Sequence, residues 1–268
     1  MNKKLQYLIS MLVGITAIAS AGIITNNVYF SDFTDAGKTD LADYGWETLN
    51  GNHQATGNSM AVNDGIVSIG NRKAGYDFGQ SYALSSTILG ADVYVDEMWM
   101  RLRIKSGGDN DGTNVRIGLG TLPLVQEQSG RFGSVAIQSH NNNEASANRF
   151  AACAQNVQSA WNNTLDNSNF VEFFVRYIDV SGQIKVDVWY NPADADNLGA
   201  PDSSTTQDYS ATYGAGLISQ LEINSWGTST PHLLDAVEVW TVVIPEPSTM
   251  GLFGIIGAGL LICRRKIR

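Results

Sequence analysis

Two groups of acidic residues stand at spacings that could serve glycoside hydrolysis. Asp92 lies near Asp96 and Glu97, and Asp235 lies near Glu238. A retaining glycosidase needs two carboxyl groups about 5 to 5.5 Å apart. Both segments look like strands, in which neighbouring side chains point to opposite faces. Asp92 and Asp96 would then share a face that Glu97 does not, and Asp235 and Glu238 would point oppositely. We therefore predict solvated strand faces and no catalytic residues.

Cysteine and histidine chemistry finds no support either. Cys153 lies in an apolar stretch, where a buried and inert thiol is expected. The histidines His53, His140 and His232 lie in polar or proline-flanked segments and are not arranged around a nucleophile. Because Cys263 belongs to the C-terminal segment, a body without that segment holds one cysteine and no internal disulfide.

A metal site is the weaker interpretation of two oxygen-rich segments. Residues 109–114 read Asp-Asn-Asp-Gly-Thr-Asn, and Asp194 and Asp196 stand in a long polar stretch. An EF-hand loop would place a bidentate Glu at its twelfth position and would be framed by helices. Asp, Asn and Gly are also the common residues of turns. We expect bare turns, no cofactor and no metal, with calcium as the alternative ligand.

The six tryptophans are candidates for sugar stacking. Tryptophan is highly buried on average, so packing is the favoured role for most of them. Three stand in alternating strands and are expected in the core: Trp99, Trp189 and Trp240. Three stand near polar or glycine-rich turns, where an exposed ring is conceivable: Trp46, Trp161 and Trp226.

The C-terminal segment has the features of a membrane-targeting signal. Pro245, Glu246 and Pro247 precede an apolar run over 250–263, which contains four glycines. Four basic residues follow it: Arg264, Arg265, Lys266 and Arg268. Such an order predicts a transmembrane helix whose basic end stays in the cytoplasm.

This order resembles the PEP-CTERM sorting tail. The resemblance implies that exosortase, a membrane protease, recognises Pro245, Glu246 and Pro247, while the helix and the basic cluster hold the substrate. It also implies an exported protein that is transiently anchored in the inner membrane and then reaches the cell surface or extracellular matrix. The alternative is an ordinary C-terminal anchor that is never cut.

The N-terminus predicts export as well. Lys3 and Lys4 precede an apolar stretch over 5–18, and Ala19 and Ala21 flank a small-residue cleavage site. Signal peptidase should leave Gly22 as the new N-terminus. We therefore expect a signal peptide over 1–21, a β-sandwich domain over 22–244 and a sorting tail over 245–268.

The body between these ends is strongly acidic. Six of the 17 Lys and Arg and one of the 26 Asp and Glu lie in the two ends, so the body has 11 basic and 25 acidic residues and a formal charge of −14. Nucleic acid and anionic lipid surfaces require clustered Lys and Arg. We therefore expect no nucleic-acid partner, and membrane contact only through the C-terminal helix before processing.

The dominant pattern of the body is short alternating runs separated by Gly, Asn and Asp, which is typical of half-buried strands. Strands are predicted over 60–69, 83–95, 98–104, 115–119, 134–138, 170–180, 183–190, 217–223 and 234–243. Turns over 63–65, 180–182 and 106–112 would close hairpins. A short helix is plausible over 145–160, and 191–212 reads as a connection outside the sheets. Pairing of residues 30–33 with the last strand would close an antiparallel sandwich.

Three segments of this pattern, residues 30–33, 175–186 and 234–240, resemble the concanavalin A-like or laminin G-like jelly roll. The resemblance implies an all-β fold and does not fix a ligand. The rival folds are an immunoglobulin-like sandwich and another kind of jelly roll. The sequence thus predicts a non-catalytic protein of the cell surface or matrix, associated with exopolysaccharide. The alternatives are a secreted glycan-active hydrolase and a purely structural envelope protein.

Overall fold

The computed structural model describes the chain in stretches between Ile24 and Val243: residues 24–48, 60–70, 73–84, 93–95, 97–107, 113–120, 133–139, 148–154, 157–180, 182–208, 217–226 and 230–243. The chain divides into two compact units. Residues 26–241 form one unit and hold both sheets. Of the other, residues 1–25 with 242–268, the described part is only the ends of the first and last strands.

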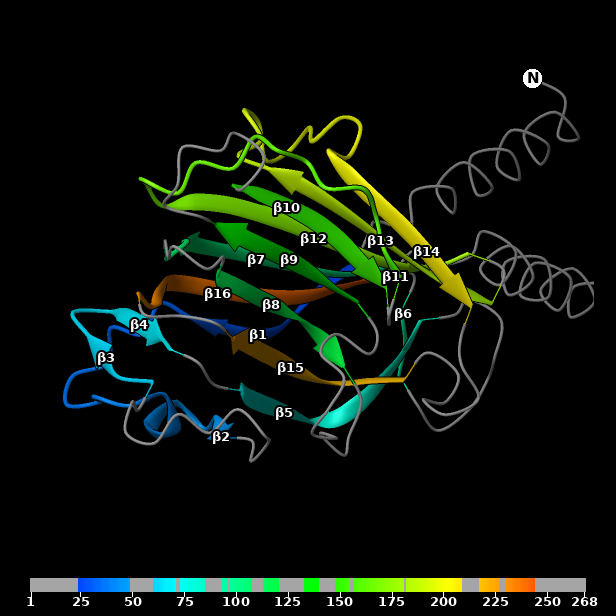
Figure 1. The fold of residues 1–268 in the computed structure, drawn as a ribbon. Helices are drawn as coiled ribbons and strands as arrows, with labels where there is room; N and C mark the ends of the chain where they lie inside the picture. The colour runs from blue at the N-terminus through cyan, green and yellow to red at the C-terminus, as the bar shows by residue number, and fades with distance from the viewer. Residues whose placement is uncertain are drawn as a thin grey trace, which may run out of the picture. The chain divides into compact units, whose positions relative to one another are not determined.

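Two eight-stranded sheets make up the described fold (Figure 1). The terminal sheet holds the first and last strands and has the order β14 (Ser203–Asp208), β13 (Gln183–Tyr190), β12 (Val171–Asp179), β7 (Glu97–Lys105), β16 (His232–Val243), β4 (Ile66–Ile69) and β3 (Val62–Asn63), with β1 (Ile24–Ser31) also paired to β16. The opposite sheet has the order β11 (Val157–Gln158), β10 (Arg149–Ala154), β9 (Gly133–Ser139), β8 (Thr113–Gly120), β15 (Leu217–Trp226), β5 (Lys73–Leu84) and β2 (Glu47–Thr48), with β6 (Val93–Val95) paired to β5. The β5–β6 pair is parallel.

Strict alternation in β7 shows how the sequence builds the sandwich. Met98, Met100, Leu102 and Ile104 are fully buried, whereas the side chains between them face solvent. Burying one such apolar side chain contributes about 1.5 to 3 kcal/mol. Because the period of a strand is two, these four residues fix which face of β7 meets the core.

Aromatic rings join the two sheets in the core. Phe150 of β10 packs edge-on against Phe173 of β12, with ring centroids 5.3 Å apart. It also stacks on Tyr190 of β13 at 5.0 Å. These contacts connect the opposite sheet with the terminal sheet across the sandwich.

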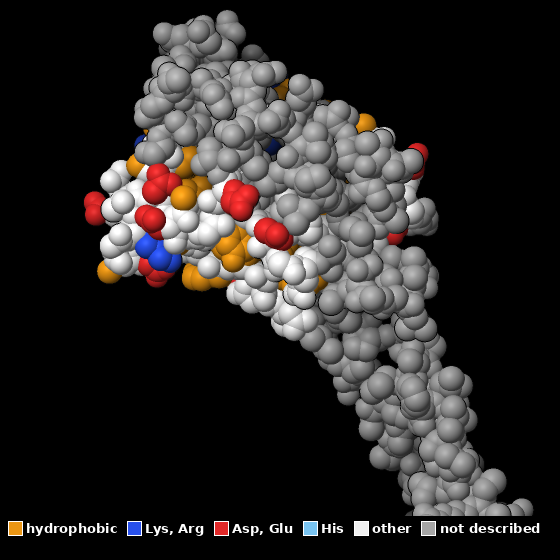
Figure 2. Space-filling model, turned by 90° about the horizontal axis from the view of Figure 1, so that it is seen from below, with side chains coloured by type: hydrophobic (Ala, Val, Ile, Leu, Met, Phe, Trp, Pro, Cys, Tyr) orange, Lys and Arg blue, Asp and Glu red, His pale blue; other side chains and the backbone are white. Residues whose placement is uncertain are grey.

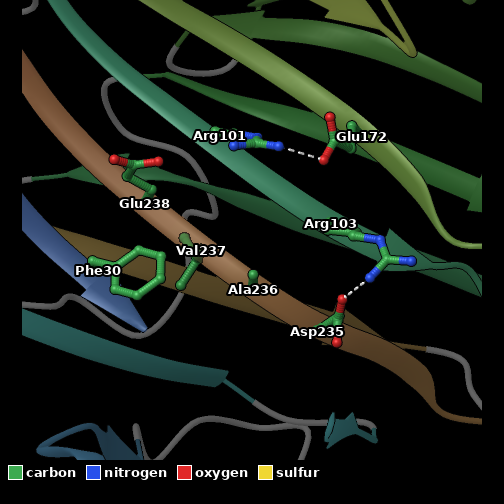
Figure 3. Close-up of a pocket in the computed structure, with 8 residues that line it drawn as sticks. All are labelled: Phe30, Arg101, Arg103, Glu172, Asp235, Ala236, Val237 and Glu238. Carbon is green, nitrogen blue, oxygen red and sulfur yellow. Dashed lines mark hydrogen bonds and ion pairs between the residues drawn. The ribbon is translucent and has the colours of Figure 1, made fainter. Parts of the chain in front are cut away.

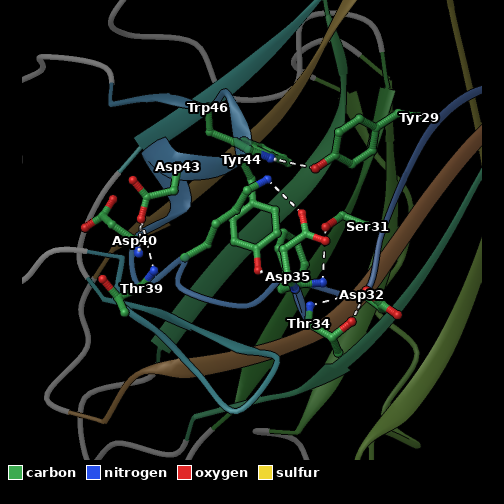
Figure 4. Close-up of polar contacts among 12 residues, drawn as sticks. Tyr29, Ser31, Asp32, Thr34, Asp35, Thr39, Asp40, Asp43, Tyr44 and Trp46 are labelled. Atoms are coloured by element: carbon green, nitrogen blue, oxygen red, sulfur yellow. Dashed lines mark hydrogen bonds and ion pairs between the residues drawn. The ribbon is translucent and has the colours of Figure 1, made fainter.

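The segment after β1 is held by short-range polar contacts (Figure 4). A 3-10 helix, η1 (Leu41–Tyr44), is capped by Asp40, and the Asp43 carboxylate accepts a hydrogen bond from the backbone N–H of Asp40. Trp46 donates through Nε1 to the Tyr29 hydroxyl at 2.9 Å. Burial raises the pKa of Tyr29 to about 12. Each of these polar groups thereby keeps a partner at the edge of the core.

Two predicted hairpins are confirmed. Asp64 and Gly65 both have positive φ, 50° and 78°, between the antiparallel strands β3 and β4. At the β12–β13 turn, the Val180 N–H donates to the Gln183 carbonyl at 2.8 Å. Gly182 supplies the positive φ of 81° that this turn needs. The predicted pairing of the first strand with the last is also present, since β1 pairs with β16.

Three expectations about local structure are wrong. Residues 106–112 close no hairpin, because β7 and β8 lie in different sheets. The expected helix over 145–160 is replaced by β10 and β11, because the small residues at 151–154 are buried in pairing with β9, which overrides their helix propensity. The connection over 191–212 contains β14, a polar strand that pairs with β13 at the edge of its sheet.

The expected signal helix and transmembrane helix lie outside the described residues. Within the part of the chain that the structure describes, no helix has the length and apolar character to cross a membrane.

A buried histidine ties the start of β16 to the end of β7. His232 is fully buried, and its Nδ1 accepts a hydrogen bond from the Gly107 N–H at 3.0 Å. Burial lowers the pKa of His232 from 6.5 to about 4. The folded protein therefore holds this imidazole neutral at pH values where an unfolded chain would protonate it.

Stability should consequently fall as the pH drops from 6.5 to 4. The unfolded state takes up a proton over this range and the folded state does not, and a difference of this size corresponds to about 3 kcal/mol. Urea unfolding of the wild type and of His232→Gln between pH 4 and pH 7.5 measures the effect. The variant should lose this part of the pH dependence, and an equal slope in both proteins would contradict the assignment.

Candidate functional site

A row of tryptophans crosses the solvent-facing side of the terminal sheet. Trp99 of β7 stacks on Trp240 of β16, with ring centroids 5.9 Å apart and an interplanar angle of 5°. It also stacks on Trp189 of β13 at 5.4 Å. Trp99 and Trp240 are half-buried and Trp189 is buried. The expectation that Trp189 belongs to the core is therefore confirmed. The expectation is wrong for Trp99 and Trp240, because their strand positions alternate with core-facing residues such as Met100 and Val239.

For the three tryptophans near turns, packing is the favoured role and an exposed ring the alternative, and the structure describes the side chains of two of them. Trp46 has the packing role, since it is only 3% exposed and contacts the rings of Tyr29 and Tyr76. Trp161 is half-buried beneath the Arg149 guanidinium, 4.5 Å from its ring centroid. The side chain of Trp226 lies outside the described part of the structure.

A buried carboxylate organises the charges beside this row. Asp187 of β13 is fully buried and accepts bonds from Arg176 at 2.7 Å and from Ser204 at 2.6 Å. Lys185 lies 3.1 Å away. Burial alone would raise the pKa of Asp187, but the bonds from Ser204, Arg176 and Lys185 hold it below its usual range. The Arg176 guanidinium also lies over the rings of Trp99 and Trp189, at 5.6 and 5.3 Å.

A pocket of about 310 Å³ opens on the same sheet (Figure 3). Four strands line it: β1, β7, β12 and β16. Its apolar lining residues are Phe30, Ala236 and the buried Val237, and the Phe30 side chain is 58% exposed. Its five charged residues are Arg101, Arg103, Glu172, Asp235 and Glu238. An accessible aromatic ring beside converging polar groups is the usual composition of a small-molecule site.

Four of those five charges are paired across strands. Arg101 bonds to Glu172 at 2.7 Å, and Arg103 bonds to Asp235. Figure 3 shows both pairs, with Glu238 separate from them on β16. Glu238 has no hydrogen-bond or ion-pair partner among the described residues. The pocket thus presents one carboxylate that is free to meet a ligand.

An irregularity in β16 brings Asp235 and Glu238 to one pocket. Leu234 and Val237 are both buried, and two partly exposed residues, Asp235 and Ala236, separate them instead of one. Such an interruption of the alternation is typical of a β-bulge. The prediction that Asp235 and Glu238 point to opposite faces is therefore wrong, since both line the pocket.

Most of the remaining candidate residues lie outside the described part of the chain. Asp92, Asp96 and the core of the 109–114 segment lie outside the described residues, as do the sorting-motif, membrane-stop and signal-cleavage residues Pro245, Glu246, Pro247, Arg264, Arg265, Lys266, Arg268, Ala19, Ala21 and Gly22. Asp194 caps its own turn, accepting from the Asp196 N–H at 2.9 Å. Among the described residues, no three His, Cys, Asp or Glu are grouped as metal ligands.

Cys153 lies on the opposite sheet and is buried, as expected. Burial raises the pKa of its thiol. The thiol form is therefore favoured, and a thiolate nucleophile is not.

Acidic side chains occur at several separate places on the face in Figure 2. This distribution agrees with the excess of Asp and Glu in the body. The surface thus favours solubility and cation association over contact with other polyanions.

Sequence reasoning missed Phe30, Arg101, Arg103 and Glu172 as site residues. The alternation in β7 does place Arg101 and Arg103 on the face opposite Met100 and Leu102. The residues that they meet depend on strand register. The register places Glu172 directly opposite Arg103 and Phe174 directly opposite Arg101, and the ion pair of Glu172 with Arg101 is diagonal. No local pattern in the sequence encodes that register.

A family model described as the PEP-CTERM protein-sorting motif matches residues 243–266. The resemblance predicted from Pro245, Glu246 and Pro247 is therefore confirmed. The motif indicates an exported protein that exosortase processes and that has a C-terminal membrane anchor. The comparison with curated proteins gave no match.

Solved structures similar to this chain are sandwiches of the concanavalin A-like kind. The CBM2 module of the evolved Dit from Lactobacillus casei BL23 phage J-1 has a TM-score of 0.50 and 12% identity, over 84% of this chain and all of that one. An endo-1,3-beta-glucanase from Streptomyces sioyaensis has a TM-score of 0.46 and 11% identity, over 82% and 97%. Peanut lectin has a TM-score of 0.44 and 13% identity, over 84% and 100%. The fold is an antiparallel jelly-roll β-sandwich, as predicted.

The buried and the exposed ion pairs of this face should differ sharply in their contribution to the free energy of unfolding. Asp187→Ala should lower the free energy of unfolding by about 3 kcal/mol, because it removes the carboxylate that Arg176 and Lys185 share in a buried position. Glu172→Ala is the matched control, since its partner Arg101 is 45% exposed, and it should cost about 0.5 kcal/mol. Urea unfolding at pH 7 measures both, and equal losses would contradict the assignment of Asp187 as the organising residue.

Proposed function

We propose that this protein is a non-catalytic carbohydrate-binding protein of the cell surface or extracellular matrix, sorted there through its C-terminal motif. Its ligand would be the exopolysaccharide of the producing cell. The observation that carries the proposal is the pocket on the terminal sheet, where the exposed Phe30 ring adjoins converging carboxylates and guanidinium groups.

The chemistry of the pocket suits a sugar. A pyranose has an apolar face that can lie on an aromatic ring, and its hydroxyls bond to charged side chains at its rim. A volume of about 310 Å³ is at the lower end of the range for small-ligand sites and suits a short segment of a polysaccharide. The sorting motif supports an extracellular ligand, since it indicates export.

A glycoside hydrolase is the second candidate, because three carboxylates line the pocket. Such an enzyme uses a pair of carboxyl groups at the scissile bond. Glu172 and Asp235 are already bonded to arginines, and Glu238 alone is free of a described partner. This arrangement favours binding over hydrolysis.

Phe30→Ala should weaken polysaccharide binding about tenfold, equivalent to about 1.4 kcal/mol. The ring is exposed, so its removal should leave the fold intact. Val180→Ala is the matched control, because Val180 is an exposed apolar residue next to β12 but outside the pocket. Co-sedimentation of the full chain in detergent with the producing cell's exopolysaccharide, cellulose, β-1,3-glucan and partly acetylated chitosan measures the loss. Equal binding by both variants would show that the polysaccharide does not bind in this pocket.

Incubation with the same polysaccharides should release no reducing ends. A binding protein returns its ligand unchanged, whereas a hydrolase creates one reducing end for each bond cut. The assay compares the wild type with Glu238→Gln. Release by the wild type that disappears in the variant would establish the hydrolase instead.

A further inference from the structure

The charge balance of the pocket narrows the class of sugar that it would take. Two guanidinium groups and three carboxylates line it, which leaves a formal charge of −1. Each guanidinium is already bonded to a carboxylate on a neighbouring strand. The remaining negative charge therefore belongs to Glu238.

Glu238 stands where a ligand can reach it. It is half-buried on β16, next to Val237 in the wall of the pocket that contains Phe30. In Figure 3 Glu238 is drawn on β16 and Phe30 on β1, and no interaction joins the Glu238 carboxylate to either ion pair. A carboxylate in this position can serve as acceptor and counter-ion for a cationic group, and the aromatic face beside it also attracts cations.

The net charge of residues 22–244 also favours a cationic ligand. Its formal charge of −14 concentrates cations near the surface and repels polymers that carry uronic acids or sulfate. A neutral glycan would gain nothing from that field. A glycan with ammonium groups would gain both the long-range attraction and a local partner in the pocket.

We infer that the ligand of this pocket is a polysaccharide bearing primary ammonium groups, a partly de-N-acetylated hexosamine polymer, with Glu238 as the counter-ion of one ammonium. This inference rests on the proposed function and specifies its ligand. Phe30 would hold the apolar face of the sugar ring, while the two arginine–carboxylate pairs would frame its hydroxyls.

The test compares two soluble probes of equal length, fully deacetylated chitosan oligomers and fully N-acetylated chitooligosaccharides. The full chain in detergent should bind the deacetylated probe at least tenfold more tightly at 20 mM salt, and 500 mM salt should reduce this preference because it screens charge. Glu238→Gln should remove most of the preference, because it removes the counter-ion of the ammonium and keeps the size of the side chain. Isothermal titration calorimetry measures the affinity of each protein for each probe at each salt concentration.

The control is Glu47→Gln, which removes an exposed carboxylate from β2 in the opposite sheet and changes the net charge by the same amount. It should keep the preference for the deacetylated probe. Equal effects of the two variants would overturn the role of Glu238 and leave only a general charge effect. Equal binding of both probes, weakened by Phe30→Ala, would overturn the inference while the proposed function stands. Absence of binding to every glycan of the panel would overturn both.

Discussion

The antiparallel register of β12 with β7 is the constraint on which this face of the molecule depends. It pairs Glu172 with Arg103 and Arg176 with Trp99, so that the charged and aromatic residues of both strands lie together on the solvent side. The same register places Met100 opposite Val175 on the core side. A slip by one residue would exchange the two faces of a strand and bury its arginines. The apolar core and the polar pocket are therefore two consequences of one pairing.

The irregularity in β16 determines which charged residues enter the pocket. If β16 alternated strictly, Asp235 and Glu238 would lie on opposite faces, and one carboxylate would enter the core. The extra partly exposed residue at Ala236 restores Val237 to the core and keeps both carboxylates in the pocket. The break in the alternation thus keeps the core face of β16 apolar and places both carboxylates in the pocket.

The sequence predicted the periodic part of this structure well and the non-periodic part poorly. Alternation in residues 98–104 and 183–190 located β7 and β13, and glycine and aspartate at 64–65 located the first hairpin. The β-bulge pattern in β16 left no clear local signal, so the shared pocket of Asp235 and Glu238 was missed. The cross-strand partner of Arg101 was also missed, because it lies 71 residues away in the sequence and is set by register. The tryptophan row was also missed, because neither hydrophobicity nor distance from a turn predicts that its rings pack on one another on the solvent side of the sheet.

The pocket also depends on the closure of the whole domain. Phe30 comes from β1 and Glu238 from β16, and these first and last strands pair with each other. Bringing together residues so far apart in sequence costs the entropy of closing the chain between them, and burial of the apolar core must offset that cost. Once the sheets have formed, backbone hydrogen bonds hold all four lining strands, and little order remains to be imposed by a ligand. A site built on paired strands is thereby preorganised by the same long-range contacts that complete the fold.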